Sequence, residues 1–394
     1  MKNIRTPFLF LLAAVTFGAV AVIADDCNEQ KTYPDWVYEY LAIPKDKPLS
    51  TASKRALERN YAQDDRFFCE FRVHDLKGDL KWEAGVTRRD PSSVLHVDGT
   101  YFVYYTKSPG KSFGFGNGDP EKKVFPWDKS EVWYATSKDG WTWKEEGVAV
   151  ARGHKGTYDD RSIFTPEVLA YGGKYYLVYQ TVKAPYANRV KNQVGMSVSD
   201  SPHGPFKRLP EPVLSPTDDG EWLGEEDNRF TVKKRGSFDS HKVHDPCIVP
   251  YKGKFYLYYK GERMGERLTM GGREIKWGVA ISDNVTGPYV KSEYNPITNS
   301  GHEICVWQYK DGIVAMLNSD GPEKGTIQYA EDGINFEIVA MISGRSKPPH
   351  AGGIVRSIVN DDDPLSAMEW GICFDRKDGW DYITRFESYK PFAP

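Results

Sequence analysis

Acidic side chains recur at one place in a repeated pattern and could share a site. Four equivalent positions carry them or a polar substitute: Asp90-Pro91, Thr165-Pro166, Asp245-Pro246 and Glu303. If these segments line one channel, their carboxylates repel one another and lose hydration, so their pKa values split. Cleavage of a glycosidic bond requires such a pair: one acid that keeps its proton and one that loses it. A single Asp-Pro pair also favours a plain turn, but two pairs in register with a Glu favour chemistry.

Two histidines stand next to these acids. His302 precedes Glu303 as His244 precedes Asp245. Histidine can act as a general acid near neutral pH because its pKa already lies in that range. Glu167 follows Thr165 by two residues and would point to the same side of an extended strand. It could bind sugar hydroxyls or a central ion.

Aromatic residues offer flat surfaces on which a sugar ring could stack. The chain has 24 Tyr and 11 Trp. Trp127 and Trp222 lie in long insertions, and Trp307 lies in a short apolar run; packing in the core or at the rim is an equal alternative for each. The histidine spacing matches no standard zinc site, and no serine stands in a nucleophile elbow.

A repeat must position these residues. Segments 90–95, 165–169 and 245–249 are each followed by a turn containing Gly and then by an aromatic run, at 101–105, 175–179 and 255–259. Two looser copies begin near 303 and 352. Four short strands in each of five units predict an all-β, five-bladed β-propeller over residues 76–394. The insertions 106–130 and 214–243 have loop composition, and such loops tend to build binding sites.

The N-terminal part differs from the repeats. Residues 1–24 begin with Lys2 and Arg5, continue into an apolar run and predict a cleaved signal peptide; Cys27 leaves a lipoprotein as the alternative. Residues 25–75 predict a small helical segment, with one helix from 33 and a second over 52–61. A helical hairpin of this size cannot bury its apolar face alone, so it must lie on the main domain or on another subunit.

Bulk properties exclude some classes of partner. The formal net charge is -3, which gives no reason to expect nucleic acid. The five Cys are widely spaced, with no CxxC pair, and Cys247, Cys305 and Cys373 sit in short apolar runs that predict small, buried hydrophobic side chains.

The chain resembles glycoside hydrolase family 117 over nearly all of its expected mature length. Ser50, Ala52 and Arg55 match the SxAxxR motif of that family's N-terminal segment, and the stretches around Asp90, Thr165-Pro166-Glu167, His244-Asp245-Pro246 and Gly301-His302-Glu303 match its active-site stretches. The resemblance implies an exo-acting, inverting α-1,3-L-neoagarooligosaccharide hydrolase. Such an enzyme releases 3,6-anhydro-L-galactose from the non-reducing end of neoagarobiose and its longer relatives, in the breakdown of agar.

The resemblance also implies roles and partners. Asp90 would be the general base, Asp245 would stabilise charge and tune the acid, and His302 would be the general acid. Thr165, Glu167, His244, Glu303 and Trp127 are the candidates for substrate binding. The N-terminal helices would cross to a partner in a homodimer. We expect a periplasmic protein whose chemistry needs no cofactor, although a divalent cation such as Mg²⁺ could occupy the central channel.

Three alternatives remain from the sequence. Repeat alignment alone selects Glu303 as the acid, as in the related five-bladed arabinosidases and xylosidases. An arabinofuranosidase or xylosidase activity is the second enzymatic hypothesis. A non-catalytic sugar-binding propeller is the third, and a channel ring of acids argues against it.

Overall fold

Short β-branched and aromatic runs form antiparallel strands in groups of four, except the first group, which has six. The computed structural model describes residues 35–58, 65–67, 69–269, 271–342, 349–350, 352–357 and 360–389. The predicted signal peptide 1–24 and Cys27 lie outside the described residues. Among the described helices, none has the length and apolar composition needed to cross a membrane.

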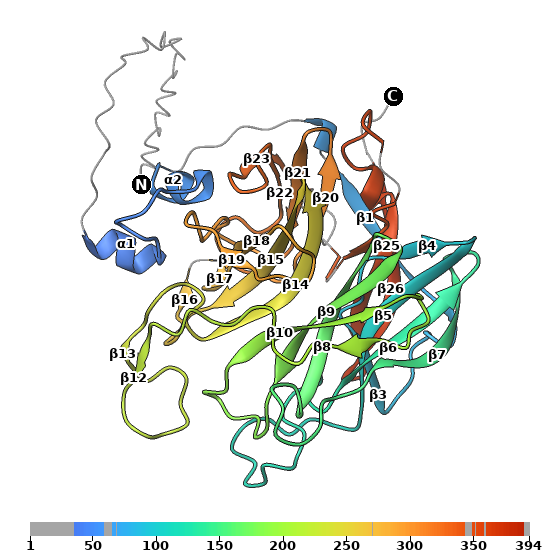
Figure 1. Ribbon diagram of the computed structural model, residues 1–394, viewed down its shortest axis with the longest axis horizontal. Helices are drawn as coiled ribbons and strands as arrows, with labels where there is room; N and C mark the ends of the chain where they lie inside the picture. Colours follow the sequence, from blue (N-terminus) through green and yellow to red (C-terminus); the bar gives the residue numbers. More distant parts are fainter. Residues whose placement is uncertain are drawn as a thin grey trace, which may run out of the picture. The chain divides into compact units, whose positions relative to one another are not determined.

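The first two groups follow each other along the chain (Figure 1). One sheet contains β2 (Lys77–Gly78), β3 (Val86–Arg89), β4 (Leu95–Val97), β5 (Thr100–Pro109), β6 (Glu131–Ser137) and β7 (Thr142–Val150). The next group contains β8 (Ser162–Tyr171), β9 (Lys174–Val182), β10 (Asn192–Ser199) and β11 (Lys207–Arg208). In both groups the central strands pair antiparallel with their neighbours in sequence.

The third and fourth groups repeat this order. The third contains β14 (Lys242–Tyr251), β15 (Lys254–Glu262), β18 (Lys276–Ser282) and β19 (Val290–Lys291), and the Asn192–Lys242 pair joins it to β10. The fourth contains β20 (Val306–Tyr309), β21 (Gly312–Leu317), β22 (Thr326–Ala330) and β23 (Glu337–Met341). Two small hairpins interrupt the order: β12 (Glu221–Trp222) with β13 (Val232–Lys234), and β16 (Leu268–Thr269) with β17 (Gly272–Arg273).

The last group combines both ends of the described chain. It contains β24 (Gly353–Ile354), β25 (Trp370–Lys377), β26 (Trp380–Tyr389) and β1 (Glu70–Asp75), with the short helix η2 (Ser366–Met368) before β25. Strand β1 pairs antiparallel with β26, as Figure 1 shows. We predicted that residues 70–75 belong to the N-terminal helical segment, but they form the strand that covers this sheet's open edge.

Apolar side chains fill the spaces between neighbouring sheets. Tyr258, Trp277 and Phe336, for example, are buried in one cluster between the third and fourth groups. Another cluster joins Trp143 of the first sheet to Ile383 of the last, so the sheets pack in a closed order. This arrangement confirms the predicted all-β propeller class. The side chains of Cys69, Cys247, Cys305 and Cys373 are buried, and the apolar runs around the last three predicted their burial.

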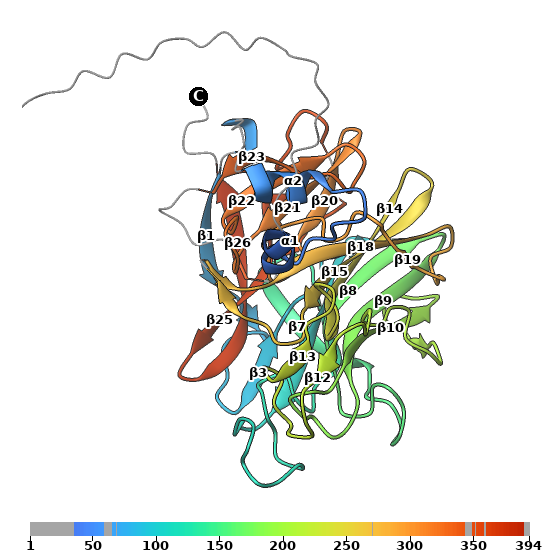
Figure 2. The ribbon, with the colours of Figure 1, turned by 90° about the vertical axis from the view of Figure 1, so that its left-hand side faces the viewer.

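Two short helices precede β1: α1 (Asp35–Leu41) and α2 (Thr51–Glu58), followed by the single turn η1 (Asp65–Phe67). Helix α2 lies next to β22 and β23 (Figure 2). Ser50 Oγ donates to the carbonyl of Pro296 at 2.8 Å, and Arg55 donates to the carbonyl of Phe336 at 2.6 Å and pairs with Glu323 at 2.9 Å. The polar residues of the SxAxxR motif therefore anchor α2 to the chain's own sheets.

Candidate active site

Three of the predicted site residues share an unusual backbone conformation. The φ angles of Asp90, Thr165 and Asp245 are 49°, 48° and 49°, in the left-handed region. The pairing register of β8 shifts across Thr165-Pro166, and that of β14 shifts across Asp245-Pro246. We predicted that these residues begin their strands, but in β8 and β14 they form bulges inside the strands. A left-handed β-branched Thr is strained, and such strain collects at functional sites.

The bulges open onto one cavity of about 450 Å³. Asp90, Thr165, His244 and Asp245 line it together with His302 and Glu303. Trp127 and its neighbours Phe115 and Phe125 line one side of it. A cavity of roughly 300–1,000 Å³ is typical of small-molecule sites, so this one has the size of such a site.

Asp90 lies among groups that oppose each other electrostatically. Its side chain is buried, and Arg89 Nε donates to its Oδ2 at 2.8 Å. Burial raises the pKa of Asp90 above its usual range, the Arg89 guanidinium opposes this shift, and the charges of Glu303 and Asp245 raise it further. Thr106 and Thr165 each place a hydroxyl 3.4 Å from the same oxygen. A raised pKa suits a carboxylate that must accept a proton.

Asp245 is neutralised locally. Lys260 of β15 forms an ion pair with Asp245 Oδ2, and both side chains are buried. Lys260 stands opposite His244 in the β14–β15 register. The pair gives this side of the cavity a fixed dipole without net charge.

His302 and Glu303 stand side by side but differ in chemistry. Gly301 precedes them with φ 109°, and a Cβ there would lie 2.6 Å from the Trp277 ring, so this close approach requires glycine. His302 Nδ1 lies 2.5 Å from Asp320 Oδ2. Burial raises the pKa of Asp320, but the hydrogen bond and charge of His302 outweigh it and lower that pKa to about 2. The bond to Asp320 fixes the ring and leaves Nε2 for a ligand.

Glu303 is held in its ionised form. Asn318 Nδ2 donates to its Oε2 at 2.9 Å. Burial alone would raise the pKa of Glu303, but the charges of His302, Lys260 and His350 bring it down to about 2. A carboxylate with such a low pKa holds almost no proton near pH 7. The low pKa argues against Glu303 as a proton donor and leaves His302, whose Nδ1 is bonded to Asp320, as the candidate.

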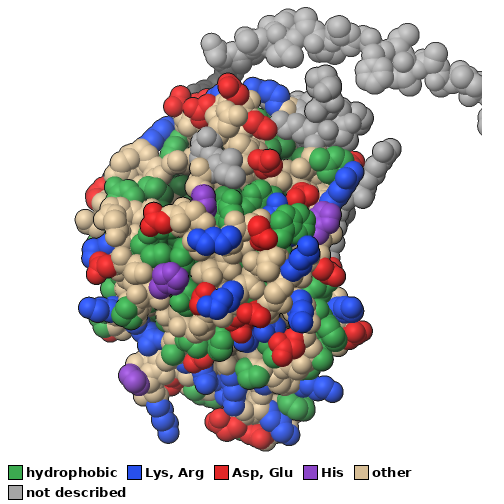
Figure 3. Space-filling model, turned by 90° about the vertical axis from the view of Figure 1, so that its right-hand side faces the viewer, with side chains coloured by type: hydrophobic (Ala, Val, Ile, Leu, Met, Phe, Trp, Pro, Cys, Tyr) green, Lys and Arg blue, Asp and Glu red, His purple; other side chains and the backbone are tan. Residues whose placement is uncertain are grey.

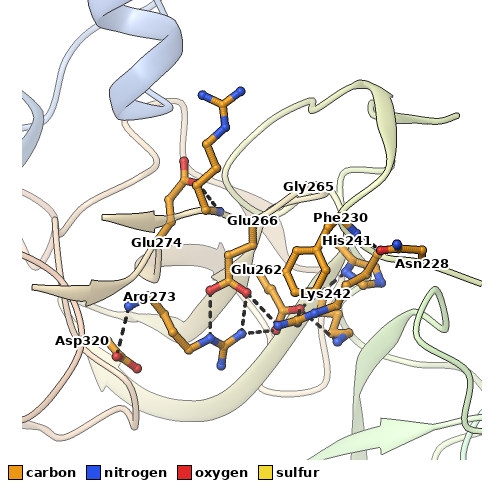
Figure 4. A network of polar contacts seen from close by, with 12 residues as sticks. Asn228, Phe230, His241, Lys242, Glu262, Gly265, Glu266, Arg273, Glu274 and Asp320 are labelled. Atoms are coloured by element: carbon orange, nitrogen blue, oxygen red, sulfur yellow. Dashed lines mark hydrogen bonds and ion pairs between the residues drawn. The ribbon is translucent and has the colours of Figure 1, made fainter. Parts of the chain in front are cut away.

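A charged wall closes another side of the cavity (Figure 4). Glu262 accepts from Lys242 at 3.0 Å and from Arg273 at 2.9 Å, and it also pairs with Arg229. Arg273 bonds Glu266 at 2.7 and 2.8 Å as well. Burial raises the pKa of Glu262, but the surrounding cations hold it well below its usual range. The network fixes the orientation of three cationic side chains at the cavity.

Two predicted binding residues differ in their surroundings. Burial holds the pKa of His244 well below its usual range, so its imidazole is neutral, and its Nε2 has no hydrogen-bond partner among the described residues. Glu167 does not line the cavity. It accepts from Ser93 N at 3.1 Å and pairs with Arg356 at 2.5 Å.

Arg356 is the cationic partner of Glu167, the residue that the sequence offered as a possible ligand of a central ion. Its other nitrogens donate to the carbonyl of Val306 at 2.9 Å and to Cys247 Sγ at 3.0 Å. Glu167 is therefore already compensated by a guanidinium. Among the described residues no group of three or more His, Cys, Asp and Glu is arranged to hold a metal ion.

Removing this internal cation should destabilise the fold. We expect Arg356→Met to lower the free energy of unfolding by about 3–5 kcal/mol, because it leaves the buried Glu167 without its cationic partner. Urea denaturation measures this change. The double variant Arg356→Met/Glu167→Gln should recover much of the loss, and an equally unstable double variant would contradict the pairing.

Sequence reasoning missed several residues of the site. Three of them pair with predicted residues: Arg89, Lys260 and Asp320. The others are the wall residues Arg229, Lys242, Glu262 and Arg273, with Glu266 bonded to Arg273. Arg89 precedes Asp90 directly and could have been noticed. The others lie on second strands or in loops with no repeated signal. Trp222 and Trp307 do not line the cavity, and Trp307 is buried in the core.

Comparison with known proteins agrees with this geometry. The model of "Glycosyl hydrolases family 43" matches residues 86–221. Two solved structures share the fold at low identity: one described as "Glycoside hydrolase" (13% identity, TM-score 0.56, 82% of this chain and 93% of that one) and an α-L-arabinofuranosidase, PaAbf62A, from Podospora anserina (12% identity, TM-score 0.50, 82% and 97%). No protein of curated function matches the chain by sequence.

The propeller fold and its acid-lined cavity define a glycoside hydrolase. The structure of Zg3597, a family 117 glycoside hydrolase produced by the marine bacterium Zobellia galactanivorans, is similar to this chain with 34% identity and a TM-score of 0.67, over 83% of this chain and 92% of that one. The chain belongs to glycoside hydrolase family 117. Its enzymatic class excludes the non-catalytic sugar-binding alternative.

Proposed function

We propose that the enzyme is an exo-acting, inverting hydrolase that releases 3,6-anhydro-L-galactose from the non-reducing end of neoagarobiose and its longer relatives. The observation that carries this proposal is the convergence of Asp90, Asp245 and the His302-Glu303 pair on one cavity of about 450 Å³. A cavity of this size supports attack at a chain end. We take the five sequence repeats as five blades around this site.

In the proposed reaction Asp90 accepts a proton from a water molecule while the oxygen of that water bonds to the anomeric carbon. His302 donates the proton on Nε2 to the glycosidic oxygen while the bond between that oxygen and the anomeric carbon breaks. Asp245, paired with Lys260, stabilises positive charge that develops on the sugar. Thr165, His244, Glu303 and Trp127 would hold the sugar, whereas Glu167, which pairs with Arg356 away from the cavity lining, would not contact it.

The proposed setting rests on the sequence. The predicted signal peptide supports export to the periplasm, and the family resemblance supports a homodimer formed through the N-terminal helices. We propose that the hydrolysis needs no cofactor, since acid and base are both side chains of the chain.

Incubation with neoagarobiose tests the substrate. We expect 3,6-anhydro-L-galactose to appear, with the inverted anomer detected first by NMR. Aryl arabinofuranoside and aryl xyloside serve as comparisons. Faster turnover of either aryl glycoside, with neoagarobiose left intact, would replace the proposed substrate with that of the related propeller families.

The acid limb of the pH profile should depend on Glu303. Asp90 must be ionised to act as a base, so kcat/KM falls as the pH drops through its pKa, and this pKa is raised. Glu303→Gln removes one cause of the raised value, so the acid limb of the residual activity should move to lower pH. Glu121→Gln, in an exposed loop, is the control and should not move it. An acid limb that stays at the same pH in Glu303→Gln would contradict the proposed effect of Glu303 on the pKa of Asp90.

A further inference from the structure

The insertion between β5 and β6 separates two cavities. One side of this loop supplies Phe115, Phe125 and Trp127 to the active site. The other side, with the adjoining ends of β3, β5 and β6, lines a second cavity of about 650 Å³. None of the predicted catalytic residues lines this second cavity.

The second cavity is strongly cationic. Its charged lining residues are Lys107, Lys111, Lys123, Lys129, Arg152 and a single acid, Glu131. The chain as a whole has a formal net charge of -3, and the surface seen in Figure 3 intersperses both signs. The positive charge is therefore concentrated locally rather than shared by the whole protein.

Part of this charge has no acidic partner. Lys107 pairs with Glu145, and Lys129 lies 3.6 Å from Glu121. Lys111 and Arg152, by contrast, form no hydrogen bond or ion pair with any residue that the structure describes, and Arg152 is exposed. Two cationic side chains at the cavity are thus available to a ligand.

Lys123 is an unusual member of the lining. It is buried, and its ammonium donates to Ser108 Oγ at 2.7 Å and to the carbonyls of Pro109 at 3.1 Å and Gly110 at 3.0 Å. No carboxylate of the described residues bonds it, and burial lowers its pKa to about 8. An anion in the cavity would add negative charge near Lys123, which bonds none of the described carboxylates.

Aromatic surface accompanies the cations. Phe113 lines the cavity with 58% of its surface exposed, and Trp133 lines it beside Lys107, whose Nζ lies 3.6 Å from the ring centre. An exposed aromatic ring offers an apolar face to a sugar ring, while Lys and Arg bond sulfate or carboxylate oxygens. A concave site that offers both surfaces suits a saccharide better than a free inorganic anion.

We propose that this cavity is a second saccharide-binding site, for a sugar unit that carries a sulfate ester or a carboxylate group. Phe113 packs against the ring, and Lys111 and Arg152 bind the anionic group. The insertion between β5 and β6 lines both cavities, so the second site would hold an anionic saccharide chain beside the hydrolytic cavity. This inference does not depend on the identity of the hydrolysed substrate.

Isothermal titration calorimetry at low salt tests the site with three probes of similar length: a sulfated galactan oligosaccharide, an oligogalacturonate and an unsulfated galactan oligosaccharide. Binding of at least one anionic probe is expected, with at least a tenfold weaker affinity for the unsulfated one. The sulfated and carboxylated probes together show which anion is preferred. Equal affinity for all three, or no binding of either anionic probe, would overturn the proposal.

Variants locate the binding. Lys111→Glu/Arg152→Glu should weaken the anionic probe at least tenfold and leave kcat/KM on an uncharged substrate unchanged. Lys207→Glu/Lys310→Glu makes the same charge change at exposed lysines that line neither cavity and should bind normally. An equal loss in both double variants would show long-range electrostatics only and would overturn the site.

Two further results separate the remaining explanations. Trp127→Ala, which alters the hydrolytic cavity, should still bind the anionic probe; loss of binding there, with binding kept in Lys111→Glu/Arg152→Glu, would place the ligand in the hydrolytic cavity. Inorganic sulfate should compete only weakly. Competition as strong as that of the sulfated saccharide would overturn the saccharide part of the proposal.

Discussion

His302→Ala should lower kcat/KM on neoagarobiose by roughly 10²–10⁴-fold, the usual contribution of a general acid. The same variant should lose far less activity on a substrate whose leaving group is a good one, such as a dinitrophenyl glycoside. A good leaving group departs without protonation, so it bypasses the missing acid. Steady-state kinetics with the two substrates measure both effects.

Glu303→Gln is the matched test of the alternative acid. Its carboxylate is already ionised, with a pKa lowered to about 2. The variant should therefore lose activity on both substrates to a similar degree, without rescue by the leaving group. Selective rescue of Glu303→Gln, with none for His302→Ala, would assign the acid to Glu303 and return the enzyme to the pattern that repeat alignment selects.

Asp320→Asn tests the support of the acid. Asp320 Oδ2 lies 2.5 Å from His302 Nδ1 and fixes the ring. The variant should show the leaving-group dependence of His302→Ala in weaker form. A purely structural role for Asp320 would instead lower activity on both substrates alike.

The repeats made the strands predictable, because each pairs locally with its neighbour in sequence. Strand β1 was missed because it pairs with β26, at the other end of the described chain. No local pattern shows which distant strand will cover an open edge. The same limit explains why residues 70–75 were placed in the helical segment.

The residues of the site also fall into some that the sequence predicted and some that it missed. Asp90, Thr165 and Asp245 were found because each precedes a proline in a repeated context, although their left-handed conformation inside a bulge was not foreseen. Lys260 and Asp320 were missed because each is defined by the side chain that it contacts and not by a repeated sequence signal.

Glu167 illustrates the limit of strand alternation. The two-residue spacing from Thr165 predicted the same side of a regular strand, but the bulge at Thr165-Pro166 breaks that regularity. The carboxylate lies against Ser93 and Arg356 instead of in the cavity. A proline inside a strand is a warning that alternation cannot be counted across it.

Asp90→Asn should lower kcat/KM by roughly 10²–10⁴-fold on neoagarobiose and by a similar factor on an activated aryl substrate, because both need a base to activate water. Asn is the right replacement because Asp90 has a φ of 49°, and Asn tolerates the left-handed region better than most residues. Its melting temperature should therefore stay close to that of the native enzyme, which separates lost chemistry from lost folding.

Azide provides the positive result for this variant. As a nucleophile that needs no deprotonation, it should restore turnover of the activated substrate in Asp90→Asn and give a glycosyl azide of inverted configuration. A product of retained configuration would make Asp90 something other than the base of an inverting reaction. Full activity on the aryl substrate without azide would also contradict the role, because water would then be attacking unaided. Glu303 and Asp245 both raise the pKa of Asp90. In Asp90→Asn this position no longer titrates, so their charges should no longer set the acid limb of the pH profile.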